Sequence, residues 1–156
     1  MKILCVDVGT GTQDILLYDS DREIENCLKL IMPSPTLLVA KQVKQATRER
    51  RAIVLTGVTM GGGPSHWAVK DHVAAGCKAY ATPEAARTFD DELDKVEAMG
   101  IRVVSEDEAR RIDENGDRTL HLRDFDYDAI RSAFAAFGLE LNVDGLALAV
   151  FDQFLG

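Results

Sequence analysis

A short run of glycines and threonines after an aspartate is the first place in this chain where side chains could do chemistry. Two glycines two positions apart let the backbone take positive φ angles and bring its amides close to a ligand. Successive amides of this kind form a concave nest for phosphate oxygens, and threonine hydroxyls add further donors. The candidate phosphate-binding residues are Gly9, Thr10, Gly11, Thr12 and Gln13.

Asp7 stands at the end of a predicted buried strand, residues 2–8, where an acidic side chain is unexpected unless it has a specific role. Carboxylate oxygens suit Mg²⁺, which keeps several waters and bridges to phosphates. We therefore predict that Asp7 holds Mg²⁺ and takes part in catalysis, and that the turn after it binds phosphate. The alternative is a tight hairpin turn without a ligand, although such a turn does not require an aspartate before it.

A second glycine-rich segment, residues 57–65, lies between a predicted strand and a predicted helix. Ligands of α/β sheets gather at the carboxyl ends of strands, and the free amides of a helix amino terminus favour anions. A flexible connection that carries a helix cap would explain the same residues, and both interpretations stay open. The candidate substrate contacts are Thr59, Gly61, Gly62, Gly63, Ser65 and His66.

An aspartate also follows the apolar run of residues 146–151 near the end of the sequence. This arrangement repeats that of the first strand, so Asp152 is a candidate catalytic residue, either in a metal shell or as a base. The four residues after it lack the glycine and threonine pair of the first turn. A plain aspartate at the end of a strand is therefore the competing interpretation.

The composition is that of a globular domain, with 46% hydrophobic and 28% charged residues among 156. The net charge of −8 argues against anionic partners, so we expect neither nucleic acid nor a membrane surface. Cys5, Cys27 and Cys77 form neither a disulfide framework nor a Cys-x-x-Cys pair. A reducing cytoplasm is the expected location, and no apolar run approaches the roughly 18 residues of a membrane span.

The order of apolar runs and turn signals predicts three strands, followed by helices that alternate with strands. Short connections between the first strands imply antiparallel hairpins, and the later alternation implies parallel additions. A helix start is predicted at Ser34, and helix ends at Gly76, Gly100 and Gly138. We therefore predict an α/β fold, a mixed sheet with opening antiparallel β-hairpins and flanking helices.

Asp7, Gly9 and Thr10, with Asp19 at the end of the second strand, resemble the first phosphate motif of a known superfamily. That superfamily holds actin, the sugar kinases and the large ATP-driven chaperones. The resemblance implies a ribonuclease H-like lobe of an actin-like ATPase, with ATP and Mg²⁺ as cofactors.

Three stretches, residues 7–19, 33–36 and 59–76, resemble a prokaryotic family described as putative pyruvate formate-lyase activating enzyme. Members of that family look longer than this chain, which therefore resembles an amino-terminal lobe, residues 1–145. Residues 146–156 are then the final strand of that lobe or the start of a second one. A missing C-terminal lobe is an expected partner.

These observations favour a nucleotide-binding lobe that serves ATP hydrolysis or phosphoryl transfer to a small molecule. The first alternative is a nucleotide-gated binding or assembly module, for example a homo-oligomer. Gln13 and Asp14 point that way, because they stand where a basic residue is frequent in the superfamily. The second alternative is the activity that the family description names, which requires a Cys-x-x-x-Cys-x-x-Cys motif that the three cysteines do not form.

Overall fold

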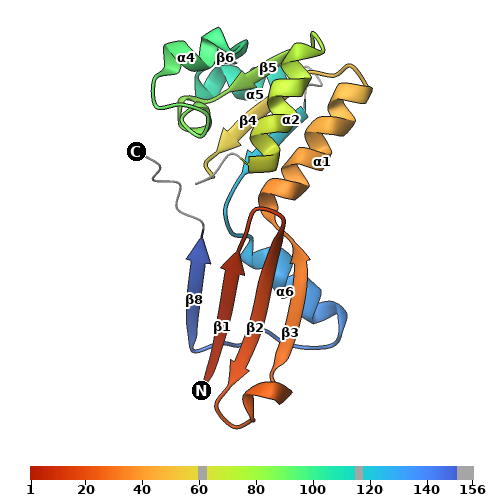
Figure 1. The fold of residues 1–156 in the computed structure, drawn as a ribbon, viewed down its shortest axis with the longest axis vertical. Coiled ribbons are helices and arrows are strands. Elements are labelled where there is room, and N and C mark those ends of the chain that lie inside the picture. The colour runs from red at the N-terminus through yellow and green to blue at the C-terminus, as the bar shows by residue number, and fades with distance from the viewer. Residues whose placement is uncertain (60–62, 115–117, 151–156) are drawn as a thin grey trace.

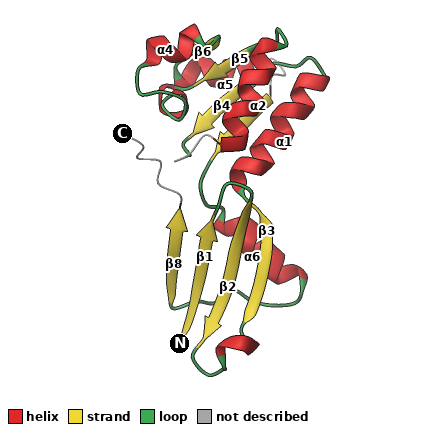
Figure 2. Ribbon diagram, in the orientation of Figure 1, coloured by secondary structure: helices red, strands yellow, loops and turns green. Residues whose placement is uncertain are grey.

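The computed structural model describes residues 1–59, 63–114 and 118–150, which form two four-stranded sheets at opposite ends of the long axis (Figure 1). The strands are β1 Lys2–Val8, β2 Thr12–Asp19, β3 Leu28–Pro33, β4 Ile53–Gly57, β5 Ala79–Ala81, β6 Ile101–Val103, β7 Arg118–Leu122 and β8 Gly145–Val150. The helices are α1 Pro35–Arg48, α2 Gly63–Ala74, α3 Pro83–Ala86, α4 Leu93–Ala98, α5 Glu106–Glu114 and α6 Tyr127–Ala136, with a 3₁₀ turn at Ile24–Asn26. The chain builds β1 to β3, crosses to the second sheet through α1, and returns through α6 to β8 (Figure 2).

The first sheet has the strand order β3-β2-β1-β8. Its strands β1, β2 and β3 pair in antiparallel fashion, whereas β8 pairs with β1 in parallel. Alternate residues of β1, namely Leu4, Val6 and Val8, are buried in one cluster with Ile130 and Phe134 of α6. The predicted mixed sheet with opening antiparallel hairpins and a flanking helix is confirmed.

The opposite face of the first sheet is open as far as the described residues reach. Ile31 on this face is 70% exposed, and a shallow hollow of about 540 Å³ lies over the strands. The apolar run of β1 predicted a buried strand, but the structure buries one of its two faces, because the helix packs on one side. We call this surface the open face; it includes Cys5, Asp7, Asp14, Leu16, Ile31, Ala147 and Ala149.

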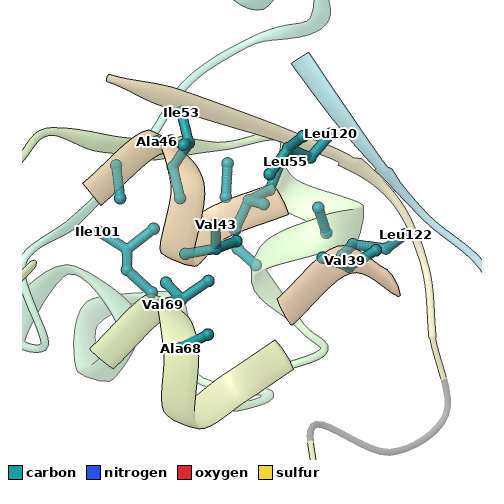
Figure 3. Close-up of a cluster of buried hydrophobic side chains, with 14 of the residues drawn as sticks. Val39, Val43, Ala46, Ile53, Leu55, Ala68, Val69, Ile101, Leu120 and Leu122 are labelled. Carbon is teal, nitrogen blue, oxygen red and sulfur yellow. The ribbon is translucent and has the colours of Figure 1, made fainter. Parts of the chain in front are cut away.

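The second sheet has the order β6-β5-β4-β7 and is parallel throughout. Ile53 and Leu55 of β4 belong to the main core with Val43 of α1 and Val69 of α2, as Figure 3 shows. Val54 packs in a separate cluster with residues of α5, so helices cover both faces of this sheet. Complete burial of a side chain such as that of Leu55 stabilises the fold by about 2 kcal/mol.

A second, separate sheet was not predicted from the sequence. Helix α1 has 14 residues and therefore carries the chain about 21 Å, after which β4 pairs with strands that follow it. The predicted helix ends are confirmed, since Gly76, Gly100 and Gly138 have positive φ angles of 79°, 91° and 73°. Within the described ranges, no helix is both long and apolar enough to cross a membrane.

Candidate functional site

The turn between β1 and β2 is closed by a hydrogen bond of 2.9 Å from the amide of Gly9 to the carbonyl oxygen of Thr12. This bond occupies the Gly9 amide. The amides of Thr10 and Gly11 donate to no acceptor in the described part of the chain, and both residues are exposed. They are the amides that the turn offers to an anion.

The predicted positive φ angles of this turn are wrong, because neither Gly9 nor Gly11 is among the glycines with positive φ. Lack of room for a side chain, rather than a positive φ angle, explains why position 9 is a glycine. A Cβ atom at Gly9 would lie 3.1 Å from the Thr12 carbonyl oxygen, which closes the turn. A Cβ atom at Gly11 would meet nothing within 4 Å, so that position stays accessible from outside.

Ser34 fixes the turn to the start of helix α1. Its amide donates to the carbonyl oxygen of Gly11 at 3.0 Å, and its hydroxyl donates to the carbonyl oxygen of Thr10 at 3.0 Å. Ser34 was predicted to cap α1, but its fully buried side chain makes no capping hydrogen bond, because the hydroxyl is directed at the turn. The first amides of α1 therefore lack a side-chain cap from this residue.

The start of helix α2 lies against the start of α1 and close to the turn. The hydroxyl of Thr36 donates to the hydroxyl of Ser65 at 3.0 Å, and the Ser65 amide donates back to Thr36 at 3.3 Å. A Cβ atom at Gly63 would lie 3.7 Å from the Thr10 side chain. Two helix amino termini therefore meet beside the exposed turn (Figure 1), and their partial positive charges favour an anion there.

Thr59, at the carboxyl end of the second sheet, also lies near the turn. It is buried, its hydroxyl donates to a carboxylate oxygen of Asp124 at 2.5 Å, and its amide contacts the Thr88 hydroxyl at 3.5 Å. Together with Gly9 and Thr10 it lines a hollow of about 20 Å³, enough for roughly one water molecule. The predicted phosphate-binding turn and Thr59 of the second glycine-rich segment thus lie close together in space.

His66 lies in a different pocket, although it was grouped with Thr59. Its half-buried ring packs against that of Phe89 with centroids 5.2 Å apart, in a hollow of about 170 Å³ that Lys70 also lines. Burial lowers the pKa of His66 below its ordinary value, and the nearby positive charge of Lys70 lowers the pKa further. The His66 ring therefore lies in this pocket, and not in the hollow that Gly9 and Thr10 line beside the turn.

Asp7 and Asp14 are direct partners across the β1–β2 ladder, so their carboxylates lie side by side on the open face. Both residues are exposed. Side chains at such paired positions have Cβ atoms about 5 Å apart, and like charges there repel each other. Two acids that repel in the free protein are suited to share a cation.

Gln13 lies on the other face of the first sheet, so it does not act together with Asp7. Its side chain is 6% exposed, and its Nε2 atom donates to the carbonyl oxygen of Pro33 at 3.0 Å. Its Oε1 atom is buried and accepts no hydrogen bond from any described residue. Gln13 therefore has a buried acceptor atom, Oε1, without a hydrogen-bond donor among the described residues.

Sequence reasoning missed three contributors: Asp14, Ser34 and Thr36. Asp14 could have been found, because a hairpin whose turn centres on residues 10–11 places position 7 opposite position 14. Ser34 and Thr36 lie in one of the stretches that carry the family resemblance, but as individual residues they indicated only a helix start. The candidates Gly61, Gly62 and Asp152 lie outside the described residues.

Comparisons with known proteins gave one match. A family model described as Putative pyruvate format-lyase activating enzyme (DUF1786) matches residues 60–153, which is more than half of the chain. The matched range covers α2 to β8 and does not include the turn of residues 9–12. None of the curated proteins and none of the solved structures in the comparison matches the chain.

Proposed function

The chain belongs to the family described as Putative pyruvate format-lyase activating enzyme (DUF1786), and within that family we propose that it binds ATP with Mg²⁺. It would act as one lobe of an actin-like ATPase or small-molecule kinase of ribonuclease H-like fold, joined by a C-terminal lobe. The first sheet supports this proposal, since it opens with antiparallel hairpins and continues with a parallel strand.

One observation carries the proposal: the exposed turn and two helix starts meet at Thr10. The amides of Thr10 and Gly11 are without acceptors among the described residues, and Ser34 holds the turn in one position. Fixed amides and helix dipoles stabilise the negative charge of a phosphate without reorganising when it binds. In a phosphoryl transfer reaction such positioning and charge neutralisation supply most of the catalysis.

The donor set fits Mg²⁺ because Asp7 and Asp14 offer two carboxylates on neighbouring strands. Mg²⁺ is commonly held by one or two carboxylates together with phosphate oxygens and waters. In the described part of the chain no group of three acidic, histidine or cysteine side chains could hold a metal ion. The two aspartates would therefore hold the ion jointly with the phosphates, and the ion would neutralise phosphate charge.

Calorimetry with ATP and Mg²⁺ tests this proposal. We expect a measurable affinity that falls at least about tenfold, or 1.4 kcal/mol, in Asp7→Asn. Asp91→Asn is the matched control, because Asp91 is an exposed acid in the second half of the molecule. If the wild-type protein binds no ATP, or if the two variants bind it equally well, the nucleotide proposal is wrong.

The open face favours a second candidate, a nucleotide-gated assembly module without efficient catalysis. Its hollow of about 540 Å³ is mainly apolar, and large apolar surfaces that stay exposed mark interaction sites. A homo-oligomer that covers this face would bury Ile31 and its neighbours. Sedimentation velocity with and without ATP separates the candidates, since a nucleotide-dependent change in mass belongs to the assembly module.

The activity in the family description finds no support in the cysteines. Cys5 lies in β1, Cys27 directly before β3 and Cys77 after α2 in the other half of the molecule. An iron–sulfur cluster of the radical-activating kind needs thiolates from a Cys-x-x-x-Cys-x-x-Cys segment. An iron analysis of the purified protein tests this alternative, and stoichiometric iron would support it.

We also propose a cytoplasmic location. The three cysteines are free thiols in the structure, which suits a reducing compartment. Thiol labelling of the protein in intact cells and in lysates would test this location.

A further inference from the structure

The hollow of about 170 Å³ beside helix α2 is separate from the one that Gly9 and Thr10 line. One of its walls is a single face of α2, because residues at spacings of four and three share a helix face. The other walls come from the segment after α3, from the end of α4 and from the start of β6. The lining residues are His66, Lys70, Val73, Phe89, Met99 and Ile101.

The floor of this hollow is apolar and is held by the main core of the second sheet. Ile101 belongs to that core (Figure 3), and Val73 and Phe89 pack against it. Gly100 lets the chain between α4 and β6 approach α2, since its φ angle is 91° and a Cβ atom there would lie 2.6 Å from Cγ1 of Val73. Met99, which is 44% exposed, forms an outer wall. Core packing therefore fixes the floor and leaves one side accessible.

The volume limits the occupant to a small molecule. An apolar cavity of about 150 Å³ accepts benzene, whereas pockets for larger ligands begin at about 300 Å³. A volume of about 170 Å³ therefore suits a compact apolar body such as one six-membered ring.

The polar groups of the hollow are His66 and Lys70, and none of the six lining residues is acidic. Lys70 is exposed and forms no ion pair with any described residue. The pKa of His66 is lowered by burial and by the charge of Lys70, so its ring is neutral near pH 7 and has an N–H group to donate. In the described part of the chain, no hydrogen bond occupies a ring nitrogen of His66.

One ammonium group and one neutral ring match a singly charged acceptor. A carboxylate carries one negative charge and has two oxygens that only accept, so it can take a hydrogen bond from Lys70 and another from His66. A phosphate group near pH 7 carries nearly two charges, and a single lysine would leave part of that charge without a partner.

We propose that this hollow is a second ligand site, which binds a small monocarboxylate with a compact apolar body. The carboxylate accepts from Lys70 and His66, and the apolar body packs between Phe89, Met99 and Ile101. Binding transfers no group and uses no residue of the turn at Gly9 to Thr12. The site is therefore independent of the proposed nucleotide site.

Titration of the whole chain with benzoate, followed by ¹H–¹³C spectra of the methionine methyl groups and histidine rings, tests the proposal. We expect saturable shifts of the Met99 methyl and His66 ring signals. Met32, on an exposed position of β3 in the first sheet, provides an internal control that should not shift. If benzoate gives no saturable shift at Met99 and His66, the proposal is refuted.

Two further probes separate the contributions of the charge and of the apolar body. Benzyl alcohol has the ring without the charge, and acetate has the carboxylate without the ring. Each should bind at least about fivefold more weakly than benzoate, because each lacks one half of the match. Equal affinity of either probe and benzoate, or displacement of benzoate by equimolar inorganic phosphate, contradicts the proposed ligand class.

Variants locate the binding to the hollow. Lys70→Met keeps an apolar stem of similar length, so it should weaken benzoate at least about fivefold and leave benzyl alcohol unchanged. Lys44→Met, an exposed lysine of α1, is the matched control and should bind benzoate like the wild type. Met99→Trp fills the hollow from its exposed wall and should abolish the shift of the His66 ring. Wild-type affinity for benzoate in folded Lys70→Met or folded Met99→Trp overturns the proposal.

Discussion

Replacement of Gly57 by alanine is the sharpest test of how the carboxyl end of the second sheet is built. Gly57 ends β4 with a φ angle of 72° and pairs with Leu122 of β7. A Cβ atom there would overlap the Leu122 carbonyl oxygen and would lie 2.7 Å from Cε1 of His121. The side chain of His121 can rotate away, but the backbone oxygen can move only if the two strands separate.

The expected cost of Gly57→Ala has two parts. The left-handed backbone conformation costs about 1 kcal/mol for a residue with a side chain. Separating β4 from β7 to relieve the backbone contact adds about 2 kcal/mol, in the range of overpacked cores. The total of about 3 kcal/mol is a large part of the 5–15 kcal/mol that is typical for a domain.

The variant Gly76→Ala measures the cost of the left-handed backbone conformation alone. Gly76 has a similar φ angle of 79°, but a Cβ atom there would meet nothing within 4 Å. We expect it to cost about 1 kcal/mol, and Gly11→Ala, with open space and no positive φ, to cost only a few tenths of a kcal/mol.

Urea unfolding followed by circular dichroism gives the three free energies of unfolding. The difference between Gly57→Ala and Gly76→Ala should be about 2 kcal/mol, with m-values close to that of the wild type. Equal free energies for these two variants would refute the reasoning, because they would mean that no close contact exists between Gly57 and β7.

Three further predictions follow from other contacts. Asp14→Asn should raise the free energy of unfolding by roughly 0.2–1 kcal/mol without Mg²⁺, because it removes repulsion from Asp7, and thermal melts should show a smaller gain at high salt. Burial lowers the pKa of His72 below its ordinary value of 6.5, against a smaller raising effect of the hydrogen bond to the Lys78 carbonyl. The unfolded chain therefore takes up a proton first, so stability present above pH 6.5 falls as the pH drops below it, and His72→Gln should flatten this slope in urea titrations below pH 6.5. Ser34→Ala should cost about 1 kcal/mol, since it removes the hydroxyl that anchors the turn, and calorimetry should show weaker ATP binding; unchanged affinity would contradict a fixed turn.

Local signals in the sequence predicted much of the first sheet. The apolar run before Asp7, the short connection after it and the helix-ending glycines each depend on neighbouring residues, and these elements are found where they were expected. The α/β class and the mixed sheet follow from the same local patterns. Patterns of this kind do not specify which strands pair across long separations.

The remaining features depend on contacts between distant residues. Ser34 and Pro35 have the sequence of a helix start, and nothing in that pattern shows that the Ser34 hydroxyl is directed at Thr10. Local sequence patterns likewise did not indicate that β4 pairs with β5 and β7 rather than with β1. Gln13 was chosen for its place in the turn, but its side chain is buried and lines a hollow together with Pro35 of α1 and Ala129 of α6, which lie far from it in the sequence.

The parallel pairing of β8 with β1 sets an order of events during synthesis of the chain. Leu4 stands beside Leu146, so the first sheet gains its fourth strand only after residues 145–150 have left the ribosome. The second sheet lies between these strands in the sequence and can form earlier, from nearer contacts. Until β8 arrives, β1 presents an unpaired edge that another chain could occupy. Premature release of the chain before residue 145 should therefore favour aggregation through β1.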